Sequence, residues 1–304
     1  MNNKIFAAID IGSNAIRLLL KEVDIASNEK KINKLQLVRV PLRLGTEAFS
    51  KGEISKETVN KMISLMKAFR HLMKIFEVSD YRACATSAMR KVSNNKRIIR
   101  KVHHKTGIKI EIISGEEEAR LLSDIRIKSI NKDNPSSHQL FVDVGGGSTE
   151  LNLFENNNHL LATSFNIGTV RILQDCVKPE TYDSFKETLL SLKNKYSDFA
   201  IVGTGGNINK LVRLQEKKNG RDNFISTDSL QRLYDDMTNM SIDERIRKYN
   251  LKGDRAEVIV PAASIFLEVV NSLSVNGIAV PTAGLADGII NELFKQYCVR
   301  YHIA

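Results

Sequence analysis

A glycine-rich turn between two apolar runs is the first feature of this sequence that could do chemistry. Residues 140–145 read Leu-Phe-Val-Asp-Val-Gly, and after two further glycines Ser148 and Thr149 open a second run that alternates like a strand. Glycine lets backbone N–H groups approach a phosphate closely, and hydroxyl groups add donors. Because a strand follows the turn, it is neither a Walker loop nor a dinucleotide fingerprint, both of which open a helix. The pattern predicts a phosphate clamp at the tip of a β-hairpin.

Two carboxylates flank this turn. Asp143 ends the first apolar run, and Glu150 follows seven residues later on the other side of the glycines. Oxygen ligands beside a phosphate clamp suit Mg²⁺, which shares its coordination shell with substrate phosphate. The alternative is that Asp143 only hydrogen-bonds the glycine turn.

The N-terminus repeats the pattern. Residues 6–12 are an apolar run that ends in Asp10, then a β-branched residue and Gly12, before a polar turn and a second apolar run. Two similar hairpins indicate duplicated halves. Asp10 is therefore a third candidate metal ligand, with the same alternative as Asp143. A further transition from strand to glycine turn to helix occurs at residues 200–207.

The segment 114–120, Ser-Gly-Glu-Glu-Glu-Ala-Arg, contains a candidate catalytic base. Ser114 and Glu117 have the spacing of a capping box, and Glu116 lies in the first turn, where the helix dipole favours a negative charge. Glu118 instead heads the apolar stripe of the same helix. A carboxylate in that position is either paired in a core or exposed in a cleft. In a cleft it could orient and deprotonate a water that attacks phosphate.

Cys84 and Arg90 have the Cys-x₅-Arg spacing of cysteine-dependent phosphatases. The five residues between them contain no glycine, so the loop cannot easily wrap around a phosphate. We therefore interpret Cys84 as a small buried strand residue and keep Arg90 as a phosphate contact.

The remaining pattern predicts the elements that hold these residues. Apolar residues spaced three and four apart predict a helix that Ser55 caps, and residues 93–105 predict a basic helix. Residues 81–85 and 108–113 read as strands. The most loop-like segment, residues 131–137, is where we expect a domain boundary.

Length and composition fit a globular α/β protein of two domains. The chain has 304 residues, 42% of them hydrophobic and 26% charged. We expect residues 1–125 to form a basic first domain and residues 126–304 a second, with the final helix as a segment that could pack back on the first.

The distribution of charge and the number of cysteines indicate which classes of binding partner and which compartment to expect. Residues 1–125 carry 24 Lys and Arg against 14 Asp and Glu, whereas residues 126–304 are balanced. Residues 81–110 alone hold nine basic side chains and no acidic one, which favours an anionic partner over a merely solvated helix face. Three widely spaced cysteines and the lack of a long apolar run predict a cytoplasmic protein without a membrane partner. The absence of Trp and of recognition modules argues against a nucleic-acid partner.

Five segments together resemble one family. Residues 10–14, 86–90, 113–120, 143–150 and 202–206 are similar to the signatures of the exopolyphosphatase / guanosine pentaphosphate phosphohydrolase (Ppx/GppA) family, in its short two-domain form. The resemblance implies two actin-like, ribonuclease H-like domains with a cleft between them. It also implies Mg²⁺-dependent release of terminal phosphate from polyphosphate or from pppGpp. Stimulation by K⁺ and a homodimer stay open.

The resemblance also assigns roles to residues. It places the catalytic carboxylate at Glu118 and the metal ligands at Asp143 and Glu150, with Asp10 as a further candidate. The expected phosphate contacts are Gly12, Ser13, Asn14, Arg17, Ser87, Arg90, Gly145, Gly146, Gly147, Ser148, Thr149, Gly205 and Gly206.

Two departures from the family pattern leave the substrate open. Ala15 stands where a serine commonly follows the asparagine, and Ala286 where an arginine is frequent. Two alternatives to a phosphohydrolase stay open as well: an ATP-dependent kinase with the same glycine loops, and a non-catalytic sensor of polyphosphate or alarmone.

Overall fold

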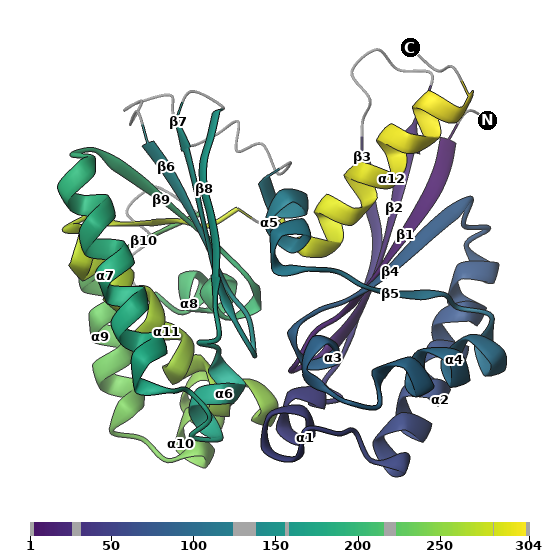
Figure 1. The fold of residues 1–304 in the computed structure, drawn as a ribbon, viewed down its shortest axis with the longest axis horizontal. Helices are drawn as coiled ribbons and strands as arrows, with labels where there is room; N and C mark the ends of the chain where they lie inside the picture. Colours follow the sequence, from purple (N-terminus) through teal and green to yellow (C-terminus); the bar gives the residue numbers. More distant parts are fainter. Residues whose placement is uncertain are drawn as a thin grey trace. The chain divides into compact units, whose positions relative to one another are not determined.

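A computed structural model describes residues 3–25, 32–123, 138–155, 158–215, 223–281 and 283–301 of the protein. The chain divides into two compact units, one of Met1–Ile125 with Leu285–Ala304 and one of Arg126–Gly284. Each unit contains one β-sheet with helices packed on it (Figure 1). The expected mixed α/β fold with two sheets is therefore confirmed. The loop expected at residues 131–137 lies outside the described residues.

The sheet of the first unit has the strand order β3-β2-β1-β4-β5. Its strands are β1 (Asn3–Ile11), β2 (Ile16–Asp24), β3 (Ile32–Val40), β4 (Asp80–Ala85) and β5 (Ile110–Ile112). The first three strands pair antiparallel, and β4 and β5 continue the sheet parallel to β1. The carboxyl ends of β1, β4 and β5 consequently meet at one edge, where α/β sheets usually bind ligands.

Six helices of the first unit lie within the described residues. They are α1 (Leu44–Lys51), α2 (Lys56–Ile75), α3 (Ser87–Lys91), α4 (Asn95–Thr106), α5 (Gly115–Ser123) and α12 (Leu285–Tyr301). The Ser55 side chain accepts a hydrogen bond from the Thr58 backbone N–H and starts α2, as its sequence predicts. Met66 and Phe69 of α2 are buried, so this helix contributes its apolar stripe to the core.

The last helix joins the first unit. Phe294 of α12 packs edge-on against Phe6 of β1, with ring centroids 5.9 Å apart, and Gly288 lies against the backbone of Leu121 in α5. The second unit therefore ends at Gly284 rather than at residue 304.

The sheet of the second unit has the order β10-β11-β9-β6-β7-β8. Its strands are β6 (His138–Val144), β7 (Thr149–Glu155), β8 (Asn158–Phe165), β9 (Phe199–Thr204), β10 (Phe224–Ser226) and β11 (Gly277–Ala279). Strands β6, β7 and β8 pair antiparallel, and β9 and β11 continue parallel to β6. The run β8-β7-β6-β9-β11 thus has the same order and directions as the sheet of the first unit.

The described helices of the second unit enclose an apolar core. They are α6 (Thr169–Leu173), α7 (Pro179–Lys195), α8 (Gly206–Leu214), α9 (Thr227–Thr238), α10 (Ile242–Tyr249) and α11 (Gly253–Leu273). By length and composition α11 could span a membrane, but 67% of its most apolar window is buried within the protein. Phe266 of α11 is fully buried together with Leu140 and Leu151 of the sheet, so α11 is a core helix.

Candidate functional site

A row of four polar side chains crosses the sheet of the second unit. Asp143 on β6 lies opposite Glu150 on β7, and Ser164 on β8 and Thr204 on β9 extend the row on either side. Residues directly opposite each other on paired strands project from the same face of a sheet. The glycine turn therefore places both predicted carboxylates on one face, at the ends of their strands. Thr204 and Ser164 carry no motif, and sequence reasoning missed them.

Hydroxyl groups hold both carboxylates. Thr204 Oγ1 donates a short hydrogen bond to Asp143 Oδ1, and Ser164 Oγ donates to Glu150 Oε1 at 3.0 Å. Glu150 is 1% exposed. Asp143 is partly buried, so two carboxylates with limited access to solvent lie side by side and repel one another. Such a donor set is suited to a hard divalent cation with oxygen ligands.

Residues of α6 hold the glycine turn through hydrogen bonds to its carbonyl groups. Gly145 N–H donates to Ser148 O at 2.9 Å and closes the turn, while Thr169 N–H donates to Gly145 O at 3.0 Å. Arg171 Nε donates to Gly147 O at 2.6 Å. With these carbonyl groups occupied by α6, the turn has a defined backbone. No local pattern in the sequence indicates the role of Arg171, which lies 24 residues away.

Gly168 sits directly against this turn. A Cβ at Gly168 would lie 2.5 Å from the backbone N and C atoms of Gly147, so only glycine fits.

The hydroxyl of Thr149 donates to Ile167 O at 2.7 Å and is fully buried. Its single proton is thus already used, which argues against the phosphate contact expected for Thr149.

Gly205 forms a second turn beside Asp143. Its φ of 109° is rarely adopted by residues with a side chain, and a Cβ there would lie 3.4 Å from Asp143 Oδ1. Gly206 begins α8, so the amino end of that helix follows immediately. The positive end of the helix dipole favours an anion near such a turn.

In the first unit the equivalent hairpin carries an ion pair. Asp10 lies opposite Arg17, and Arg17 Nη1 contacts Asp10 Oδ2 at 2.6 Å. Gly12 N–H donates to Ala15 O at 3.2 Å, which matches the closure of the Gly145 turn. The expected metal ligand Asp10 and the expected phosphate contact Arg17 are thus each other's partners.

The loop after β1 is docked on the start of α1. Gly45 N–H donates to Ser13 O at 2.7 Å, and Arg43 N–H donates to Asn14 O at 2.9 Å. The Oδ1 atom of Asn14 is buried and has no hydrogen-bond partner among the residues that the structure describes. A buried amide oxygen of this kind usually accepts a hydrogen bond from water or another donor. It cannot itself contact a phosphate oxygen, because both are acceptors, so the expected phosphate contact of Asn14 needs its Nδ2 group.

Glu118 is buried and paired within the first unit. Ser114 Oγ accepts from Glu117 N–H at 3.0 Å and begins α5, as predicted. Glu118 is 6% exposed on the apolar side of the helix. Arg90 Nη1 donates to Glu118 Oε2 at 3.0 Å and to Ile113 O at 2.8 Å. The structure thus joins the candidate base to a candidate phosphate contact that lies 28 residues earlier.

Cys84 does not have the properties of a nucleophile. It is fully buried in β4, and burial raises the pKa of its thiol to about 12. The thiolate that a cysteine-dependent phosphatase needs is therefore not populated near neutral pH. Ser87, at the start of the short helix α3, is 7% exposed.

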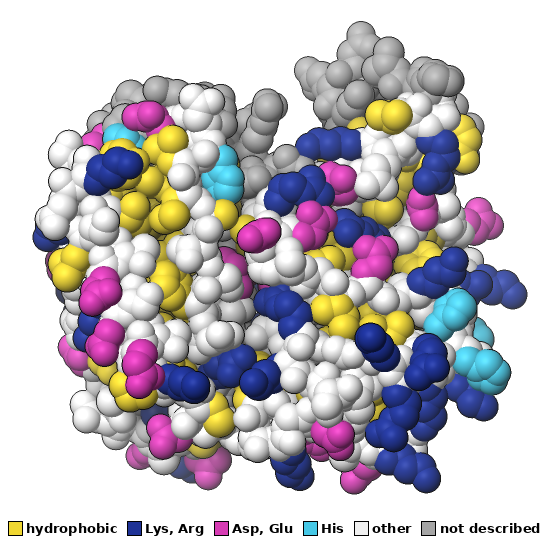
Figure 2. Space-filling model, viewed as in Figure 1, with side chains coloured by type: hydrophobic (Ala, Val, Ile, Leu, Met, Phe, Trp, Pro, Cys, Tyr) yellow, Lys and Arg dark blue, Asp and Glu magenta, His cyan; other side chains and the backbone are white. Residues whose placement is uncertain are grey.

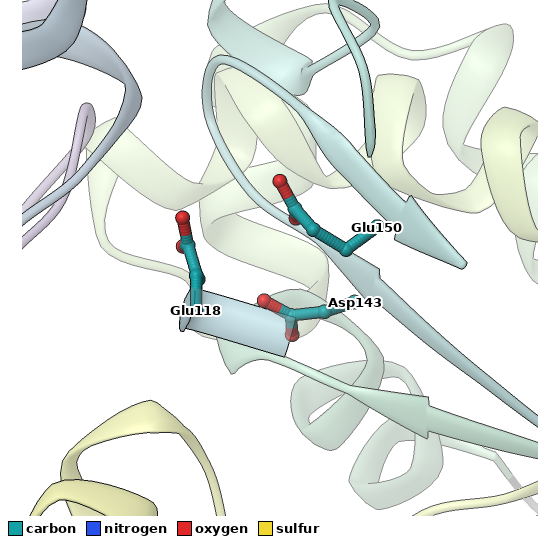
Figure 3. A group of neighbouring side chains, drawn as sticks. All are labelled: Glu118, Asp143 and Glu150. Carbon is teal, nitrogen blue, oxygen red and sulfur yellow. The ribbon is translucent and has the colours of Figure 1, made fainter. Parts of the chain in front are cut away.

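Within each unit the candidate residues converge on one end of the sheet. The first unit gathers its candidates after β1, β4 and β5, and Thr86 N–H donates to Ile11 O where β1 and β4 end. The second unit gathers its candidates after β6, before β7 and after β9. Figure 3 shows Asp143 and Glu150 on the neighbouring strands β6 and β7.

Comparison with known proteins is consistent with these motifs. The family model described as the Ppx/GppA phosphatase family matches residues 25–297. A bifunctional 3-dehydroquinate synthase/phosphatase of Fusobacterium nucleatum is 28% identical over 89% of this chain. A guanosine-5'-triphosphate,3'-diphosphate pyrophosphatase of Photobacterium profundum is 25% identical over 98% of it. The chain spans 44% and 60% of the lengths of these two relatives.

Solved structures share the fold. A crystal structure of an exopolyphosphatase from Cytophaga hutchinsonii matches with a TM-score of 0.81 and 23% identity, covering 96% of this chain and 98% of that one. The Ppx/GppA family member of Aquifex aeolicus matches with a TM-score of 0.75 and 24% identity, covering 97% and 99%. Because the family model matches residues 25–297, the chain belongs to the Ppx/GppA phosphatase family.

Proposed function

We propose that the protein is a cytoplasmic phosphohydrolase that releases terminal phosphate from inorganic polyphosphate, from pppGpp or from both. The observation that carries this proposal is the buried Glu118 carboxylate, held in place by the Arg90 guanidinium. Membership of the Ppx/GppA phosphatase family supports it. The names of the relatives, a pyrophosphatase of guanosine-5'-triphosphate,3'-diphosphate and an exopolyphosphatase, support the two substrates.

Each group of residues has a part in the proposed reaction. Glu118 accepts the proton of the attacking water, and Arg90 orients that carboxylate and faces the charge that develops on the phosphoryl group. Asn14 and the turns at Gly145 and Gly205 hold the phosphate oxygens through amide groups. Ser148 is 4% exposed at the end of its turn and keeps this role as well. Such reactions depend on positioning and electrostatics, without a covalent intermediate.

We propose Mg²⁺ as the cofactor, held by Asp143 and Glu150. The two carboxylates and their hydroxyl donors are oxygen ligands of the kind that Mg²⁺ takes. When bound, the ion would neutralise charge on the substrate oxygens. Asp10 is a weaker candidate ligand because its carboxylate already faces Arg17 at 2.6 Å. Stimulation by K⁺ stays an expectation from the family resemblance.

The test is phosphate release with Mg²⁺ from long polyphosphate, tripolyphosphate, pppGpp and ATP in parallel. The Glu118→Gln variant should lose turnover by at least about a hundredfold while it still binds substrate. Glu116→Gln, on the exposed side of the same helix, is the matched control and should stay active. Equal activity of wild type and Glu118→Gln would refute the role of Glu118. Tight binding without release by the wild type would identify a sensor instead.

A further inference from the structure

A basic hollow lies on the first unit between α2 and the end of α4. It has a volume of about 520 Å³ and is lined by Lys67, Arg70 and His71 of α2 and by His104, Lys105, Thr106 and Gly107 at the end of α4. The Glu118 and Arg90 side chains are not part of its lining. The hollow is therefore distinct from the candidate site described above.

The packing of the two helices creates this hollow. Lys101 Nζ contacts Asn60 Oδ1 at 3.3 Å, and the guanidinium of Arg70 lies next to Gly107, which ends α4 with a φ of 72°. The helices therefore stay side by side along their length. Phe69 and Val102 are buried, so the polar residues of both helices are left on the outside.

The lining carries only one sign of charge. Lys67, Arg70 and Lys105 are exposed, and no carboxylate in the described part of the chain lines the hollow. Among the described residues no ion pair joins these three cations to an acidic side chain, whereas Arg82, Arg120 and Lys21 of the same unit pair with Glu111, Glu292 and Asp287. Figure 2 shows Lys and Arg side chains, with histidines beside them, crowded over α2 and α4 at the lower right of the view. Unbalanced cations around a concave surface concentrate anions.

The chemistry of the lining selects among anions. Arg70 can bind two oxygens of one phosphate, and the Lys ammonium groups suit further oxygens as point charges. The described residues that line the hollow include no Phe, Tyr or Trp, so the bases of a nucleic acid would lack the usual aromatic stacking partners there. A chain of several phosphate groups without bases fits a lining that has several cations and lacks aromatic side chains.

We propose that this hollow binds an oligophosphate anion, at a site separate from that of Glu118. Lys67, Arg70 and Lys105 contact its oxygens, and His71 and His104 flank it. The proposal does not depend on the proposed hydrolysis, because binding can be measured through the side chains that line the hollow.

The experiment follows the histidine ring signals by NMR during a titration with tripolyphosphate at about 0.15 M salt, where weak surface attraction is screened. EDTA is present, so that the probe stays intact whether or not the protein hydrolyses it. The sequence has six histidines, and His71→Gln and His104→Gln assign the two signals of interest. Both signals should shift and saturate, while the His138 signal of the second unit stays in place.

Two triple variants separate a site from a general charge effect. Lys67→Gln/Arg70→Gln/Lys105→Gln should weaken the saturating shift by at least about tenfold. Lys51→Gln/Lys56→Gln/Lys61→Gln removes the same charge from exposed positions of α1 and α2, and it should leave the affinity within about twofold. Equal weakening by both triples, or a shift that never saturates, would overturn the proposal.

The choice of ligand is tested in the same titration. Sulfate should need at least about tenfold higher concentration than tripolyphosphate for the same shift, since it offers one tetrahedral anion for three cations. Equal affinity for sulfate would overturn the oligophosphate assignment. Tighter binding of a short single-stranded RNA than of tripolyphosphate would overturn it in favour of nucleic acid.

Discussion

The guanidinium of Arg90 lies 3.0 Å from the carboxylate of Glu118 and 2.8 Å from the carbonyl oxygen of Ile113. One nitrogen thus ties the last turn of α3 to α5 and to the chain just before it. A buried carboxylate without a partner would favour its neutral form, and the adjacent cation favours the ionised form that a general base requires. The pair therefore fixes the position of Glu118 and places a cation beside it.

Replacing Arg90 tests this relationship. Arg90→Gln should lower the free energy of unfolding by about 1–3 kcal/mol, because it leaves a buried carboxylate without its cation. Phosphate release should fall at least about tenfold. Arg90→Lys keeps the charge, so its stability and its rate of phosphate release should lie between those of the wild type and of Arg90→Gln. Urea unfolding and kcat measure these effects. Arg97→Gln, an exposed position on α4, removes the same charge, and a similar loss in that control would contradict the prediction.

The two hairpins show what local sequence can predict. Asp10 and Asp143 each end a strand, and in each case the residue seven positions later lies directly opposite across the turn. That spacing and the glycine turn are local, so the hairpins and the carboxylate pair of the second unit could be predicted. Once the register is known, the sequence also explains their difference, because Arg17 stands where the second unit has Glu150.

Contacts between distant segments could not be predicted in this way. Arg171 supports the turn through Gly147 O, and Arg90 reaches Glu118, across 24 and 28 residues. Such contacts depend on how α6 and α3 pack on their sheets, which no local spacing specifies. The same holds for α12, whose return to the first sheet depends on the fit of Phe294 against Phe6.

The acidic pair in the second unit predicts a trade between stability and metal binding. Like charges directly opposite each other on paired strands destabilise a sheet, so Glu150→Gln should raise the free energy of unfolding by about 0.5–1 kcal/mol in EDTA. Saturating Mg²⁺ should stabilise the wild type, because a ligand of the folded state adds its binding free energy, and this gain should vanish in the variant.

Thermal unfolding with and without Mg²⁺ measures both effects. Glu187→Gln on α7 is exposed and serves as the control, with no change in the Mg²⁺ response. If Glu150→Gln were stabilised by Mg²⁺ as strongly as the wild type, Glu150 would not be a ligand.

Gly168 predicts a steric test of the phosphate turn. In Gly168→Ala the new Cβ would lie 2.5 Å from the Gly147 backbone, so the turn or α6 must shift. We expect a loss of about 1–3 kcal/mol in unfolding free energy and a higher KM for the phosphate substrate. Gly253→Ala, whose Cβ would lie 3.9 Å from its nearest neighbour, should change stability by less than about 0.5 kcal/mol. Equal effects would show that the fit at Gly168 is unimportant.

Glu117 predicts a pH dependence of stability with a definite sign. Its carboxylate accepts from Arg120 Nε at 2.8 Å and from Arg120 Nη2 at 3.0 Å, and these hydrogen bonds hold the pKa of Glu117 below its usual value of 4.5. A carboxyl group whose pKa is lower in the folded state stabilises the fold above its unfolded pKa. That contribution is lost as the pH falls through the folded pKa.

Glu117→Gln should therefore be less stable than the wild type near pH 7, by no more than about 1 kcal/mol because the ion pair is only partly buried and solvent screens it. The difference should shrink as the pH falls below 4.5 and approach zero in acid, because both proteins then lack the charge. Urea unfolding at neutral and acidic pH measures it. Glu116→Gln, one position earlier and exposed, should show no such convergence. A difference for Glu117→Gln that stayed constant with pH would mean that the Arg120 ion pair contributes nothing and that only side-chain packing was lost.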